Sequence, residues 1–242
     1  MRSTMNCDRE GNVATDSPGD RMTAQGFVYL SHWLDEHSPM YGNGEGLRLQ
    51  QTRSIARGDT ANTHHLSIPN HIGTHVDAPN HFIPDGACTS DFPASFWVFA
   101  SPFLLRKSAA PNELIVLTSD ELESIPEGTD LLLLKTGFER FREDPTLYCL
   151  SNPGLAPQLA DDLRERRPTI RAIGIDCISI TAFAHREVGR RAHHHFLRGP
   201  SPILPVEDVK LGEIERSPKR VICLPLMVRA IDGAPVTILG EF

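Results

Sequence analysis

A short apolar run in the middle of the chain constrains the fold most strongly. Residues 130–135 contain four consecutive leucines, and such a run is typical of a strand that is buried on both faces. A helix with leucines at helical spacing is expected at residues 155–167 and ends before Pro168, and a second buried strand follows at residues 172–175. This alternation in the second half of the chain, after a strand-rich first half, predicts an α/β fold with a mixed sheet.

The remaining elements are expected from alternating apolar residues and from helix signals. Ser119 is a candidate N-cap of a short helix, and a second helix is expected at residues 187–198, before Gly199. Between the early strands and the leucine run, prolines and glycines predict irregular backbone. Further strands are expected at residues 27–31, 47–57, 61–68, 113–118, 203–206, 221–226 and 235–239.

Length and composition predict one large soluble domain. The chain has 242 residues, of which 40% are hydrophobic and 23% charged, values that are ordinary for a globular protein. The first 25 residues are polar and lack an apolar core segment, so we expect a flexible leader at 1–25 rather than a signal peptide, and a folded domain at 26–242.

Charge and cysteine content limit the partners and the compartment. The net charge is −7 and no run of Lys or Arg occurs, so no nucleic-acid partner and no membrane partner is expected. Apolar stretches fall far short of the roughly 20 residues that span a bilayer. Five scattered cysteines without a CxxC motif favour a reducing, cytoplasmic location.

The most informative segment for function is a histidine-rich stretch that runs from His71 to Phe82. His71, His75, Asp77 and His81 all occupy odd positions, so an extended chain would direct the four side chains to one face. Imidazole and carboxylate ligands suit Zn²⁺ or Mn²⁺. A hydrogen-bonded turn without a metal ion would also explain this spacing.

A second cluster combines three consecutive histidines with a later carboxylate. His193, His194 and His195 would point in three directions on a helix, so one or two of them at most could bind a metal ion. For His193 and His194 a packed or solvated helix face is the favoured interpretation. Glu207 alone also fits the first turn of a helix.

Together these residues resemble the metal-dependent cyclase-like hydrolase family, which includes bacterial kynurenine formamidase and isatin hydrolase. The His71–Phe82 segment carries most of the likeness, and His195 with Glu207 matches the family's later His/Glu pair in spacing. Four further segments resemble family motifs in the same order along the chain: Tyr29-Leu30-Ser31-His32, Lys135-Thr136-Gly137, the stretch 174–180, and Ile231-Asp232-Gly233-Ala234-Pro235-Val236.

The resemblance implies a fold, a metal centre and an assembly. The fold would be a swivelling β/β/α cyclase-like arrangement in a single domain. His71, His75 and Asp77 would be metal ligands, and His195 and Glu207 would complete that site or help to hold a second ion. His81 would be the catalytic acid/base, and the chain would form a homodimer or homotetramer.

The resemblance also implies a reaction on a small-molecule substrate. Metal-activated water would cleave an amide, lactam or lactone, such as an aryl formamide like N-formylkynurenine or an isatin-like lactam. Trp33 and Tyr41 are candidate walls of an aromatic pocket, although ordinary surface or core positions explain them equally well. Two alternatives remain open: a non-hydrolytic cyclase or dehydratase of secondary metabolism, and a metal-stabilised binding protein without turnover.

Overall fold

The computed structural model describes residues 26–242 and is built on one large mixed sheet. The predicted leader at 1–25 lies outside the described residues. Strand order in the sheet is β5-β12-β13-β4-β11-β10-β8-β6, and β1 also pairs with β13. The strands are β1 (Phe27–Tyr29), β4 (His75–Asp77), β5 (Val98–Phe99), β6 (Pro102–Arg106), β8 (Leu131–Lys135), β10 (Ala172–Ile175), β11 (Leu204–Glu207), β12 (Arg220–Pro225) and β13 (Gly233–Glu241).

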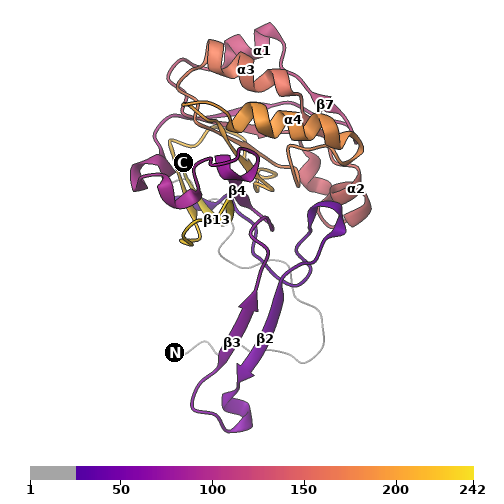
Figure 1. Cartoon of the computed structure of the whole chain (residues 1–242), viewed down its shortest axis with the longest axis vertical. Helices are drawn as coiled ribbons and strands as arrows, with labels where there is room; N and C mark the ends of the chain where they lie inside the picture. Colours follow the sequence, from indigo (N-terminus) through magenta and orange to yellow (C-terminus); the bar gives the residue numbers. More distant parts are fainter. Residues whose placement is uncertain (1–25) are drawn as a thin grey trace.

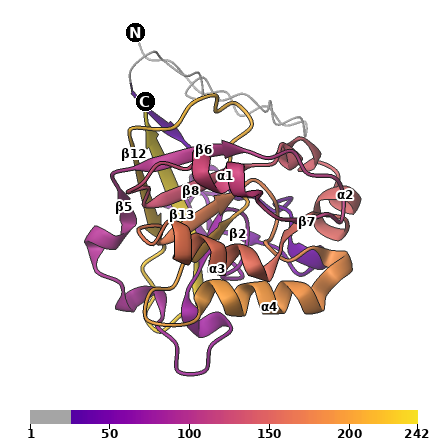
Figure 2. The ribbon, with the colours of Figure 1, turned by 90° about the horizontal axis from the view of Figure 1, so that it is seen from above.

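The parallel half of the sheet is covered by helices. Strands β6, β8, β10 and β11 are parallel, and α1 (Ser119–Ser124), α3 (Pro157–Arg166) and α4 (Arg186–Leu197) lie along one side of them (Figure 2). In β8, Leu132 and Leu134 belong to the apolar core that includes the helices, whereas Leu131 and Leu133 belong to the core on the other face. The leucine run is therefore buried on both faces, as predicted, and the α/β cyclase-like fold class is confirmed.

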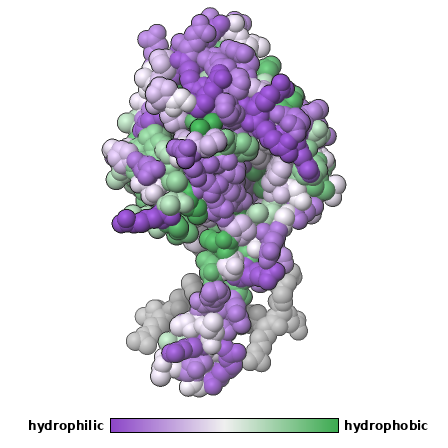
Figure 3. Space-filling view, in the orientation of Figure 1, coloured by the Kyte–Doolittle hydropathy of each residue, from purple (hydrophilic) through white to green (hydrophobic). Residues whose placement is uncertain are grey.

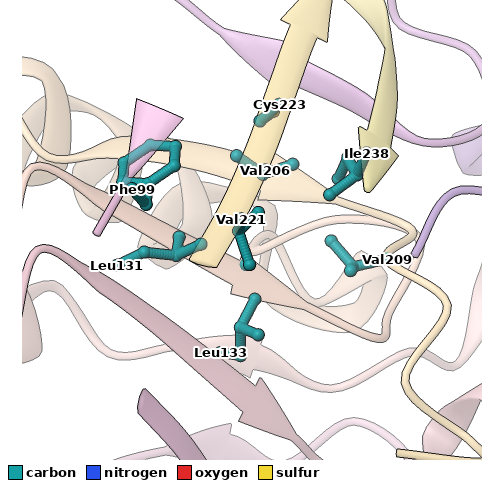
Figure 4. Close-up of a pocket in the computed structure, with 9 residues that line it drawn as sticks. Phe99, Leu131, Leu133, Val206, Val209, Val221, Cys223 and Ile238 are labelled. Carbon is teal, nitrogen blue, oxygen red and sulfur yellow. The ribbon is translucent and has the colours of Figure 1, made fainter. Parts of the chain in front are cut away.

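The antiparallel half curls the sheet around its second core. Strand β13 pairs antiparallel with β4, β12 and β1, which brings β12 towards the inner face of β8. A small apolar cavity remains between the two halves (Figure 4). Its lining consists of Phe99, Leu131, Leu133, Gly174, Val206, Val209, Val221, Cys223 and Ile238. None of these side chains is charged, so we assign no catalytic or metal-binding role to this cavity.

A two-stranded hairpin projects away from this body (Figure 1). Strands β2 (Arg48–Arg53) and β3 (Thr63–Ser67) pair antiparallel with an irregularity between Gln51 and Arg53, and every residue in both strands is exposed. Leu49 and Leu66 face each other across the pair. Apolar surface also gathers where the hairpin joins the body (Figure 3).

The structure differs from the sequence-based predictions at one helix cap, one strand and one additional helix. Thr118, not Ser119, is the N-cap of α1, because its side chain accepts from the backbone N–H of Glu121. The predicted strand at 113–118 shrinks to β7 (Leu114–Ile115), which pairs with β9 (Gly154–Leu155). A short helix, α2 (Pro145–Leu150), follows the N-cap Asp144 and was not expected. Among residues 26–242, no helix has the length and apolarity needed to cross a membrane.

Candidate metal centre

Strand β4 supplies the first two side chains of the centre. Because side chains alternate along a strand, Val76 points into the inner apolar core while His75 and Asp77 point to the opposite face. The neighbouring strand β11 pairs antiparallel with β4, and its last residue, Glu207, stands opposite His75. The His75 Nε2 atom lies 3.3 Å from Glu207 Oε2 and 3.6 Å from Asp77 Oδ1. Two strands thus bring two carboxylates and one imidazole together below the protein surface.

Helix α4 supplies another imidazole, from His193. Its Nε2 atom lies 3.2 Å from Asp77 Oδ2 and 3.4 Å from Glu207 Oε1. His195, the residue chosen from its spacing to Glu207, lies elsewhere: its Nδ1 atom bonds Asp161 on α3 at 2.8 Å. Two residues turn a helix by roughly 200°, so His193 and His195 face opposite sides. His193 therefore faces Asp77 and Glu207, whereas His195 does not. His194 is exposed.

The buried imidazoles are oriented by backbone carbonyls. His75 Nδ1 donates to the carbonyl oxygen of Gly73 at 2.8 Å, and His193 Nδ1 lies 3.0 Å from the carbonyl oxygen of Gly189. In the neutral form that binds metal an imidazole carries one N–H, so in that form these bonds would leave both Nε2 lone pairs facing the carboxylates. This is the arrangement by which proteins orient metal-binding histidines.

The carboxylates also fit a bound cation. Glu207 is anchored through Oε1, which accepts from Ser179 Oγ at 3.0 Å and from the Ile180 N–H at 2.7 Å. Asp77 Oδ2 is buried and makes no well-oriented hydrogen bond, although His193 Nε2 lies 3.2 Å away and buried polar atoms are nearly always paired. A divalent cation would satisfy this oxygen, and the combined nitrogen and oxygen donors suit Zn²⁺ or Mn²⁺.

The electrostatics of the buried groups favour positive charge between the carboxylates. Burial alone would lower the pKa of both imidazoles, but contacts with Asp77 and Glu207 raise the pKa of His75 to about 9 and that of His193 to about 10. Burial and the charge of Asp77 would raise the pKa of Glu207, but the two imidazoles lower it to about 2. The pKa of Asp77 is likewise held well below its usual value, against the effect of burial. The two carboxylates therefore stay ionised and attract positive charge into the site.

Three more exposed side chains form the outer part of the centre. His71, His81 and Asp232 have side-chain exposures of 23%, 28% and 32%, whereas those of the inner four residues do not exceed 5%. His71 Nδ1 lies 2.8 Å from Asp77 Oδ1. Burial lowers the pKa of His81 below its usual value, so its imidazole is neutral at neutral pH. The opening of the site therefore carries a neutral, solvent-accessible imidazole.

Three trios of side chains could each hold a metal ion, and two of them share Asp77. One trio is His71, His75 and Asp77, and another is Asp77, His193 and Glu207; in each, the ligand atoms lie within 4.8 Å of one another. A third trio combines His71 and His81 with Asp232. The sequence indicated Asp232 only as a member of the Ile231–Val236 segment that resembles a family motif.

The two aromatic residues predicted to line a substrate pocket, Trp33 and Tyr41, have different surroundings. Trp33 is 72% exposed and its ring contacts Tyr29. Tyr41 packs against Phe183, and the charges of Arg186 and Glu207 both influence the pKa of its phenol, which burial raises. Of the two aromatic residues, Tyr41 is therefore the one whose pKa the charge of Glu207 influences.

Comparison with known proteins gives a consistent picture. The family model described as "Putative cyclase" matches residues 28–182. A kynurenine formamidase of Bacillus anthracis is 31% identical over 85% of this chain and 95% of its own length, and Cyclase-like protein 1 of Arabidopsis thaliana is 30% identical over 87% and 83%.

Solved structures agree with the fold. Isatin hydrolase A from Labrenzia aggregata superposes with a TM-score of 0.74 at 25% identity, covering 89% of this chain and 93% of that one. A second isatin hydrolase, bound to the product analogue thioisatinate, has the same TM-score at 19% identity, covering 89% and 92% of the two chains, and supports the fold alone. With the family model matching well over half of its length, the chain belongs to the cyclase family.

Proposed function

We propose that this protein is a metal-dependent hydrolase that cleaves an aryl amide, with an aryl formamide such as N-formylkynurenine or an isatin-like lactam as substrate. Relatives named kynurenine formamidase and isatin hydrolase support the reaction class. The observation that carries the proposal is the convergence of Asp77 and Glu207 with imidazoles of His71, His75 and His193 beside the accessible ring of His81.

The metal ligands we propose are His71, His75, Asp77, His193 and Glu207. A bound divalent cation would lower the pKa of water towards roughly 7 and polarise the substrate carbonyl. Zn²⁺ and Mn²⁺ both suit these donors, and the two trios that share Asp77 support two ions. Asp77 and Glu207 stay ionised at neutral pH and balance the cationic charge.

His81 is the proposed acid/base. Its neutral ring can take a proton from the attacking water and return it to the leaving nitrogen. It is a suitable candidate because burial lowers its pKa and because its ring lies next to His71, with the ring centroids 4.0 Å apart. Tyr41, beside the centre, is proposed to border the substrate pocket, and Trp33 to line its outer approach.

The proposal is tested with the two amides and one substitution. In the metal-loaded protein, His81→Ala should leave the metal content unchanged and lower hydrolysis of N-formylkynurenine or isatin by about 10²–10⁴-fold. His194→Ala changes an exposed histidine of α4 and serves as the control with full activity. Full activity of His81→Ala would disprove the acid/base role. Turnover of polyketide-like substrates with no hydrolysis of either amide would instead favour a cyclase or dehydratase.

Assembly and location complete the proposal. We propose a homodimer or homotetramer, supported by the exposed, facing Leu49 and Leu66 of the projecting hairpin, and light scattering should give the mass of two or four chains. A cytoplasmic location is supported by the cysteines of residues 26–242, which are all free: Cys88, Cys149, Cys177 and Cys223.

A further inference from the structure

We infer that Asp232 is a positioning residue that selects the tautomers of both His71 and His81. By accepting one N–H from each ring, it leaves Nδ1 of His71 available to a metal ion and Nε2 of His81 free to act on substrate. The inference rests on the proposed acid/base role of His81 and adds a residue that the sequence indicated only within the Ile231–Val236 segment.

A single carboxylate oxygen contacts both rings. Asp232 Oδ2 lies 2.9 Å from His71 Nε2 and 2.7 Å from His81 Nδ1. The two rings are stacked at 29°. An ionised carboxylate only accepts hydrogen bonds, and Asp232 also accepts one from Asn70 through its other oxygen. Both ring nitrogens that face Asp232 therefore carry hydrogen.

This assignment determines what the other ring nitrogens can do. A neutral imidazole has one N–H, so its second nitrogen is an acceptor. For His71 that nitrogen is Nδ1, which belongs to the ligand trio with His75 and Asp77 and would be an acceptor once a bound cation replaces the hydrogen that Asp77 Oδ1, 2.8 Å away, otherwise accepts. For His81 it is Nε2, which makes no hydrogen bond to any residue in the described range 26–242. One carboxylate thus prepares a ligand and a base together.

Asp232 is itself held in a fixed orientation. Asn70 donates through Nδ2 to Asp232 Oδ1 at 2.7 Å, and more weakly to the Gly233 carbonyl at 3.4 Å. The backbone carbonyl of Asp232 accepts from the Ala78 N–H at 2.8 Å. Asp232 therefore joins the loop that carries His71, the turn that carries His81 and the start of β13.

The fixed amide of Asn70 makes the substitution Asp232→Asn diagnostic. Because Asn70 presents a donor, the new side-chain amide should turn its oxygen towards Asn70 and its NH₂ towards the two histidines. His81 Nδ1 would then become an acceptor and its hydrogen would move to Nε2. The base would be blocked, and because the same NH₂ also faces Nε2 of His71, the kinetics are compared at equal measured zinc content.

The first readout is the tautomer of His81. ¹⁵N chemical shifts of the zinc-loaded protein, in a buffer alkaline enough to keep the ring neutral, should show Nδ1–H in the wild type and Nε2–H in Asp232→Asn. The His81 signals are identified by their loss in His81→Ala. This readout needs no substrate, so it tests the inference even if neither amide is hydrolysed and the proposed function fails.

The second readout compares the effect of the substitution on kcat with its effect on KM. At saturating zinc, Asp232→Asn should lower kcat for the hydrolysed amide by roughly 10²-fold or more and change KM by less than about threefold. The matched control is Asp161→Asn, which removes an equally short bond, from Asp161 to His195 Nδ1, at a similar side-chain exposure of 30% but outside the metal centre. This control should leave both constants unchanged.

A reciprocal exchange provides the rescue. In the double variant Asn70→Asp with Asp232→Asn, the new carboxylate accepts from the new amide, whose oxygen again faces the histidines. Nδ1–H of His81 and at least tenfold of the lost kcat should return. An unchanged His81 tautomer or an unchanged kcat in Asp232→Asn would overturn the inference, and so would a double variant no better than the single one.

Discussion

At the residue scale, the buried imidazoles are oriented by backbone carbonyls and not by the carboxylates alone. The hydrogen bonds from His75 to Gly73 and from His193 to Gly189 point each Nε2 at Asp77 and Glu207. Only one of the three consecutive histidines of α4 can reach that position, because its neighbours leave the helix in other directions.

The choice between His193 and His195 gives a direct prediction. His193→Ala should lower metal affinity by more than the roughly 10–100-fold that loss of a partner behind a ligand costs, and hydrolysis should fall with it. His195→Ala removes a surface pair with Asp161 and should change neither. Elemental analysis after dialysis against a fixed zinc concentration measures both variants, and loss of metal in His195→Ala alone would contradict the proposed ligand set.

At the scale of secondary structure elements, the position of α4 depends on close packing at Gly189. A Cβ atom there would lie 2.3 Å from the Thr181 side chain, which is far inside van der Waals contact. Thr181 Oγ1 in turn lies 3.2 Å from His193 Nδ1. The small residue thus lets the helix approach the segment that also anchors Glu207.

The substitution Gly189→Ala should therefore behave unlike an ordinary helix substitution. Alanine normally favours a helix over glycine by about 1 kcal/mol, but here the clash should lower the free energy of unfolding by about 1–3 kcal/mol and weaken metal binding. Arg191→Ala, at an exposed position of the same helix, is the control. Denaturant unfolding of both variants checks the sign, and a more stable Gly189→Ala would contradict the proposed packing.

The sequence predicts some elements better than others for physical reasons. Strands β8 and β10 are apolar, apart from Lys135 at the end of β8, because both of their faces are covered, so the local pattern is enough to predict them. Strand β4 could not be predicted from an apolar pattern, because only Val76 of its three residues is apolar. Gly73 and Pro79 also lie two residues beyond its ends. The spacing to Glu207 indicated His195, which lies on the face of α4 opposite to His193 and contacts Asp161, because spacing along the chain does not give the direction of a side chain on a helix.

At the scale of the whole molecule, the curled sheet separates an apolar interior from a charged layer behind the metal centre. In that layer Asp208, which follows Glu207, is fully buried and accepts hydrogen bonds from Arg142 and Tyr148. Glu139 lies nearby, and its Oε2 atom accepts from the N–H groups of Leu211 and Gly212. These groups tie the turn after β8 to the segment after β11.

Glu139 gives the protein a pH-dependent stability term. Burial, with help from the charges of Asp176 and Asp208, raises its pKa to about 7 against the effect of its backbone bonds. The folded state therefore binds more protons than the unfolded state between the ordinary value of 4.5 and 7, so this term lowers the free energy of unfolding as pH rises, by up to about 3 kcal/mol.

The test compares the wild type with Glu139→Gln in urea at pH 5 and pH 8, with zinc held constant. As the pH rises from 5 to 8, the free energy of unfolding of the wild type should fall relative to that of Glu139→Gln. Glu123→Gln, at a side chain that is 71% exposed, should show no such change. A pH-independent difference for Glu139→Gln would contradict a raised pKa.

The measurement that tests the central claim most directly is the metal content of the purified protein, paired with amide hydrolysis before and after chelation. The account predicts one or two equivalents of Zn²⁺ or Mn²⁺ per chain, loss of hydrolysis when a chelator removes them, and its return as the ion is added back. Hydrolysis that persists at full rate in metal-free protein, or a chain that binds neither ion, would contradict it.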